Sequence, residues 1–144
     1  MNSVCTMVIV ATDKVARFLE NSGAGQGLRE VKVMEAEATP GFADFTGRSQ
    51  GTGGTARHGF ERPTGEEEHA RDIFATEIVK TAAKLWADGG YDRLLMAAPP
   101  KMLGVLRAKL VAPLDDALSG DLNKDLSHVS VYDLPDHFSD LAEF

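Results

Sequence analysis

The chain has 144 residues, of which 43% are hydrophobic, and its formal net charge is −7. A chain of this length suits one domain with a sizeable core, so we expect residues 1–144 to form a single domain. The acidic balance argues against a protein that coats nucleic acid with its whole surface, and the lone Cys5 excludes an internal disulfide.

The N-terminal residues Met1-Asn2-Ser3-Val4-Cys5 carry no Lys or Arg, so the sequence predicts no secretory signal peptide. No apolar run approaches the ~18 residues that a membrane-spanning helix needs. We therefore expect a cytoplasmic protein with no membrane insertion.

Three strands are expected at the start of the chain. The nearly all-apolar run over 4–11 predicts a strand buried on both faces, hence central in a sheet. A tight turn at 12–14 leads into a second strand over 15–20. After a glycine-rich loop, the alternation over 28–37 predicts a third strand with one wet face. Short connections between these strands favour an antiparallel meander.

A long glycine-rich loop is predicted over 39–63, where no hydrophobic period is found. Its part 46–63 holds three arginines and one glutamate, a local net charge of +2 in an acidic chain. Guanidinium groups bind phosphates in a fork geometry, and glycines let a backbone approach them closely. The alternative is a surface loop whose arginines pair with the acidic body. The predicted binding residues for RNA or another polyanion are Arg48, Gly51, Gly53, Gly54, Thr55, Arg57, His58 and Arg62.

The longest helix pattern follows this loop. Thr64-Gly65-Glu66-Glu67 fits a capping box with Thr64 as the N-cap, and Gly89-Gly90 is expected to end the helix. Helical spacing predicts one apolar face. Its members are Ala70, Ile73, Phe74, Ile78, Ala82, Leu85 and Trp86.

The second half alternates between strands and helices. The run over 93–98 predicts another buried strand, and Pro99-Pro100 leads into a helix that ends before Pro113. A short helical turn is expected at 114–118, an edge strand around Leu122 within 119–126, and a terminal helix over 131–144. The order predicts an α/β fold: a mixed sheet with an N-terminal antiparallel three-strand meander and a C-terminal parallel β-α-β half, flanked by helices.

Neither a cofactor nor a metal is predicted. The four histidines match no zinc spacing, and His58 is the one considered for acid–base chemistry. Asp13 follows a buried strand as a magnesium ligand would. The other buried strand ends in Ala97-Ala98, so we interpret Asp13 as a turn former. No nucleotide-binding loop or nucleophile elbow is present, and no catalytic residue is assigned.

Several stretches of the chain form a recognisable set when taken together. They are Val8-Ile9-Val10-Ala11 with Ala16-Arg17-Phe18, the loop running into Glu67, Ala70 and Phe74, Leu103-Gly104-Val105-Leu106-Arg107 after Ala98-Pro99, and Asn123-Lys124-Asp125-Leu126-Ser127. In this order and spacing they resemble the bacterial host-attachment family, proteins required for attachment to host cells. That family is similar in turn to the central domain of archaeal and eukaryotic peptide-chain release factors and of Pelota-like ribosome rescue proteins.

The resemblance implies a mixed sheet with helices and a partner in translation. Release factors carry Gly-Gly-Gln in the loop before the long helix, where it promotes hydrolysis of peptidyl-tRNA. The matching positions here hold Gly53-Gly54-Thr55, and Gln50 lies nearby but out of register. The threonine argues against hydrolysis, because it replaces the glutamine of the motif.

Three functional hypotheses follow. The leading one is a non-enzymatic cytoplasmic domain that contacts RNA or the ribosome through the basic loop. The second is a peptidyl-tRNA esterase-like hydrolase in which Thr55, His58 or Gln50 positions water. The third is an oligomerising protein, such as a homodimer joined through Phe42, Phe45 and Phe60, that acts indirectly in attachment to host cells.

Overall fold

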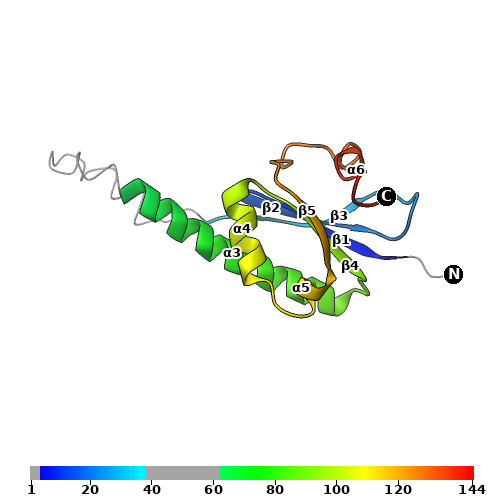
Figure 1. The fold of residues 1–144 in the computed structure, drawn as a ribbon, viewed down its shortest axis with the longest axis horizontal. Helices are drawn as coiled ribbons and strands as arrows, with labels where there is room; N and C mark the ends of the chain where they lie inside the picture. Colours follow the sequence, from blue (N-terminus) through cyan, green and yellow to red (C-terminus); the bar gives the residue numbers. More distant parts are fainter. Residues whose placement is uncertain (1–3, 38–61) are drawn as a thin grey trace.

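The computed structural model describes residues 4–37 and 62–144, and in these residues five strands form one mixed sheet in the order β3-β2-β1-β4-β5 (Figure 1). The predicted α/β class with a mixed sheet and flanking helices is confirmed. The strands are β1 Thr6–Ala11, β2 Val15–Asn21, β3 Arg29–Glu35, β4 Arg93–Ala97 and β5 Leu118–Leu122; the helices are α3 Arg62–Asp88, α4 Pro100–Lys109, α5 Leu114–Ala117 and α6 Leu134–His137.

The first three strands form the predicted antiparallel meander. β1 pairs with β2 from Thr6↔Asn21 to Ala11↔Ala16, and β2 pairs with β3 on its other edge. All six residues of β1 are buried, because β1 lies between β2 and β4 and is covered on both faces. The apolar run from Met7 to Ala11 follows from that central position.

The parallel half of the prediction is also confirmed. β4 pairs parallel with β1, and β5 pairs parallel with β4 at the edge of the sheet. α4 and α5 connect β4 to β5, as expected from the prolines at 99 and 100 and the break at Pro113.

Helix α3 differs from its prediction at the N-terminus. The helix begins at Arg62, so Thr64 lies inside it and is not its N-cap. Pro63 suits the first turn, where its missing N–H breaks no helical bond. Arg62 and Pro63 therefore belong to α3, and the rest of the predicted loop, 39–61, lies outside the described residues. The helix ends at Asp88, directly before the two predicted glycines.

The buried stripe of α3 was only partly predicted. Phe74, Ile78 and Ala82 are buried as expected, but Ala70 and Ile73 are exposed. The buried face is rotated about the helix axis relative to the predicted one. It begins at Arg71, because residues 65–70 of α3 are exposed. Its buried members are Arg71, Phe74, Ala75, Ile78, Val79 and Ala82.

The C-terminal segment is mostly irregular, and the predicted helix over 131–144 is wrong. Only α6 is helical there, and tight turns such as the one closed by the Leu141 N–H and the Phe138 carbonyl follow it. The spacing of Leu134 and Phe138 reflects packing against the sheet and not a long helix. These side chains are fully buried on the sheet face opposite α3 and α4 (Figure 1).

Two cores result, one on each face of the sheet. Along β1, Met7 and Ile9 point to the face covered by α3, α4 and α5, while Val8 and Val10 point to the C-terminal segment. This strict alternation explains how a strand that is apolar from Met7 to Ala11 contributes to two cores at once.

Candidate functional site: the exposed start of α3 and its attachment

The predicted binding residues lie almost entirely beyond what the structure describes. Arg62 is the first residue of α3, and its side chain is not among those described. The other predicted residues, all outside the described ranges, are Arg48, Gly51, Gly53, Gly54, Thr55, Arg57 and His58. The structure describes the residues on either side of 38–61 and the contacts that attach them to the sheet.

The flank on the α3 side extends away from the body. Residues 65–70 are all exposed, and the N-terminal end of α3 reaches beyond the sheet and beyond α4 (Figure 1). We call residues 62–70 the stalk. At 1.5 Å per residue it is about 13 Å long, about a third of α3. Glu66, Glu67 and Glu68 give it an acidic surface.

An ion pair attaches α3 to the sheet where the stalk ends. Counting from Gly65, Arg71 is the first buried residue of the helix, and its side chain is 9% exposed. The Arg71 Nε lies 3.2 Å from Oδ1 and 3.1 Å from Oδ2 of Asp13, and Nη2 lies 3.1 Å from Oδ2. Asp13 does lie in the β1–β2 turn, as predicted, but sequence reasoning missed its partner. The one signal was an arginine at helical spacing from the buried Phe74 and Ile78.

The other flank reaches the same turn. Thr12 Oγ1 accepts hydrogen bonds from the Lys14 N–H at 3.0 Å and the Val15 N–H at 3.1 Å. The Lys14 carbonyl accepts a bond from the Ala36 N–H at 2.9 Å, just after β3. Both described flanks of 38–61 are therefore attached to one tight turn.

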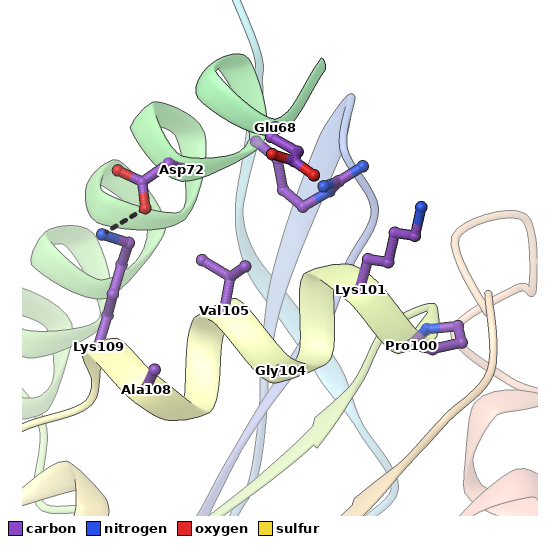
Figure 2. A pocket seen from close by; sticks show the side chains of 9 residues that line it. Glu68, Asp72, Pro100, Lys101, Gly104, Val105, Ala108 and Lys109 are labelled. Carbon is purple, nitrogen blue, oxygen red and sulfur yellow. Dashed lines mark ion pairs between the residues drawn. The ribbon is translucent and has the colours of Figure 1, made fainter. Parts of the chain in front are cut away.

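A groove with a volume of about 770 Å³ runs between the start of α3 and α4 (Figure 2). Its walls carry both signs of charge, and the Lys109 Nζ lies 2.9 Å from Asp72 Oδ1. Small residues of α4 form much of its surface. The lining residues are Glu68, Arg71, Asp72, Pro100, Lys101, Gly104, Val105, Ala108 and Lys109. Within the described residues, no three His, Cys, Asp or Glu side chains gather as a metal would require.

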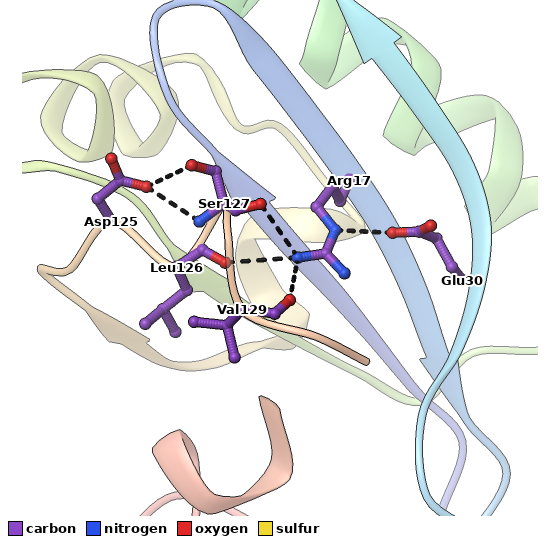
Figure 3. Close-up of polar contacts among 6 residues, drawn as sticks. All are labelled: Arg17, Glu30, Asp125, Leu126, Ser127 and Val129. Carbon is purple, nitrogen blue, oxygen red and sulfur yellow. Dashed lines mark hydrogen bonds and ion pairs between the residues drawn. The ribbon is translucent and has the colours of Figure 1, made fainter. Parts of the chain in front are cut away.

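On the opposite face, Arg17 holds the C-terminal segment (Figure 3). Its Nε donates to Glu30 Oε2 at 2.7 Å, and its Nη1 donates to the carbonyl of Val129 at 2.6 Å. The same nitrogen reaches the carbonyls of Leu126 and Ser127, each at 3.4 Å. Two stretches singled out in the sequence, around Arg17 and around Leu126, thus meet in space. Because the Arg17 side chain is 11% exposed and joins Glu30 to the backbone of the C-terminal segment, this arginine has a structural role.

A polar cluster lies at the end of the sheet opposite the stalk. The Tyr91 hydroxyl donates to Glu20 Oε1 at 2.9 Å, and Arg29 forms an ion pair with Glu20. Burial first, and then the bond to Glu20, raises the pKa of Tyr91. Burial alone would raise the pKa of Glu20, but the hydrogen bonds from Arg29 and Tyr91 outweigh burial and lower it. Neither group titrates near neutral pH, so the cluster is unsuited to acid–base catalysis.

Comparison with known proteins identifies the family. Residues 7–138 match the family described as "Protein required for attachment to host cells". The chain belongs to this family. Among the residues described for this family member, no helix is both long and apolar enough to cross a bilayer. A search of curated proteins finds no match.

Solved structures with a similar fold include an archaeal translation termination factor. The TM-score is 0.53 at 15% sequence identity, over 85% of this chain and 31% of the termination factor. The chain therefore spans about a third of the length of that protein. At this identity the similarity establishes the fold alone, the mixed sheet flanked by helices.

Proposed function

We propose that this family member is a non-enzymatic cytoplasmic domain that contacts RNA, including ribosomal RNA, through the basic segment before α3. The proposed contacts are Arg48, Gly51, Gly53, Gly54, Thr55, Arg57, His58 and Arg62. Any role in attachment to host cells is then indirect.

The observation that carries the proposal is the exposed stalk. Residues 65–70 of the helix are all exposed, so a large partner can approach this part of the stalk. The stalk itself bears Glu66, Glu67 and Glu68, which repel phosphates. Contact with RNA is therefore expected from Arg48 and Arg57, which precede the stalk, and from Arg62, its first residue. The fold shared with a translation termination factor adds support for a partner in translation.

The test is a titration of a fluorescein-labelled single-stranded RNA and of purified ribosomes with the full chain at several salt concentrations. In Arg57→Ala/Arg62→Ala we expect weaker binding. Each lost phosphate contact on single-stranded RNA reduces the slope of log affinity against log salt by roughly 0.7. Lys80→Ala/Lys84→Ala is the matched control, because it removes two exposed positive charges from the far part of α3. Parental binding by the arginine variant would overturn the proposal.

A further inference from the structure

We infer that Asp13 and Arg71 form a positioning pair that fixes the direction in which the stalk leaves the sheet. The inference rests on the proposed function for its biological meaning, because the stalk adjoins the segment proposed to contact RNA. Asp13, Arg71 and the exposed residues 65–70 all lie within the described part of the chain.

Burial along α3 locates the point of attachment. Residues 65–70 are exposed, Arg71 is buried, and Phe74 and Ala75 follow with exposures of 2% and 0%. A helix is a stiff rod, so the direction of its exposed part depends on how the adjoining buried part is held. Arg71 is the buried residue nearest to residues 65–70.

The geometry of the pair suits this role. The planar guanidinium presents two nitrogens to one carboxylate, at 3.1–3.2 Å, and a two-point contact restricts rotation as well as distance. Asp13 offers a rigid base, because the Thr12 hydroxyl holds the turn and the flanking strands are buried. Apolar contacts by Phe74 and Ala75 hold the helix on the sheet, but they are non-directional.

A second ion pair at the adjacent residue provides a comparison. Asp72 pairs with Lys109 of α4 at 2.9 Å, but the Asp72 side chain is 58% exposed. Water and salt weaken such an exposed pair, and it constrains little. The pair with Asp13 is the less exposed of the two, because the Arg71 side chain is 9% and the Asp13 side chain 39% exposed, so it is the pair that determines the direction of the stalk.

The test measures the stalk directly, by electron–electron double resonance between spin labels at Gly65→Cys and Lys32→Cys in a Cys5→Ser background. Both sites are exposed, and a side chain at 65 meets nothing within 4 Å. The parent and Asp72→Asn should give one narrow distance distribution. Asp13→Asn should broaden it, and Arg71→Lys, which keeps the charge but loses the fork, should give an intermediate width. An unchanged distribution in both Asp13→Asn and Arg71→Lys would overturn the inference.

A matched stability control separates positioning from loss of stability. Ile78→Val removes one buried methylene from the same helix and leaves the pair intact, so the distribution should stay narrow. Broadening in this control equal to that of Asp13→Asn would count against a positioning role.

RNA binding by the same variants distinguishes this inference from the proposed function. Broadening together with weaker RNA binding in Asp13→Asn supports both. If Asp13→Asn broadens the distribution but binds RNA like the parent, while Arg57→Ala/Arg62→Ala does not, the pair has no role in the contact. If Arg57→Ala/Arg62→Ala also binds like the parent, the proposed function fails and the distance result still decides the structural inference.

Discussion

Replacing Arg17 with methionine should destabilise the protein through the C-terminal segment. The Arg17 side chain is 11% exposed and donates to the carbonyls of Leu126, Ser127 and Val129, of which the Leu126 carbonyl also accepts from the Val129 N–H. A buried acceptor left without a donor costs about 1–3 kcal/mol. The bond to Val129 is short, whereas those to Leu126 and Ser127, at 3.4 Å, are near the weak end of the range.

Two effects reduce this loss. Methionine keeps the apolar stem, and the variant no longer buries a charge, which offsets part of the lost bonding. Glu30, 32% exposed, can turn to water once its partner is gone. We therefore expect the free energy of unfolding to fall by about 2 kcal/mol, a large share of the roughly 5–15 kcal/mol of a typical domain.

Urea unfolding followed by circular dichroism measures this change, and hydrogen exchange locates it. The Val129 amide, which donates to the Leu126 carbonyl at 3.1 Å, should exchange faster in Arg17→Met. Arg29→Met is the matched control, because the Arg29 side chain is 71% exposed and should cost less than about 1 kcal/mol. Parental stability and parental protection of Val129 in Arg17→Met would show that Arg17 does not hold this segment.

Three further predictions concern other parts of the fold. Gly120→Ala would place a Cβ 2.9 Å from Leu141 Cδ2, the end of a partly exposed side chain that can move aside, so we expect a loss below about 1 kcal/mol in thermal unfolding; a larger loss would show that Leu141 is held in place. Phe138→Ala empties a fully buried site and should cost about 3–5 kcal/mol in urea unfolding, whereas a loss below about 1 kcal/mol would mean that the segment repacks. Because the pKa of Glu20 is lowered in the folded state, its stabilisation is present above its unfolded value and is lost as pH falls through the folded one. Stability should therefore drop as pH falls below about 4.3, the ordinary pKa of a glutamate carboxyl, less steeply in Glu20→Gln, and parallel curves for the two proteins would contradict this.

Local patterns in the sequence were sufficient to predict the strands of the sheet and their pairing. Each of these elements was predicted from residues that are adjacent in the sequence. The apolar run predicted β1, Asp13 predicted the turn after it, and the two prolines predicted the start of α4. The parallel pairing then follows, because a strand, a helix and a second strand return in the same direction.

Long-range geometry accounts for the errors. Helical spacing placed Ala70 and Ile73 in the core, yet no local pattern reveals that the sheet ends before α3 does. The spacing of Leu134 and Phe138 fits a helix, but the same side chains also reach a sheet face from successive turns. Thr64 fits a capping box, although the helix already starts at Arg62.

The candidate site likewise combines features that local sequence reveals with features that only the fold reveals. Asp13 and Arg71 are 58 residues apart, so only the fold reveals them as partners. The basic segment can be read directly from composition, and its role remains a prediction because its residues lie outside those described.

The shared turn has an evolutionary consequence. Ala36 and Arg71 are joined to neighbouring residues, Lys14 and Asp13, so the folded body already brings the two ends of the intervening stretch together. Lengthening a stretch between fixed ends costs only about 0.6 kcal/mol per doubling. An insertion between residues 36 and 71 should therefore cost the sheet little, as long as both attachments to the turn are kept.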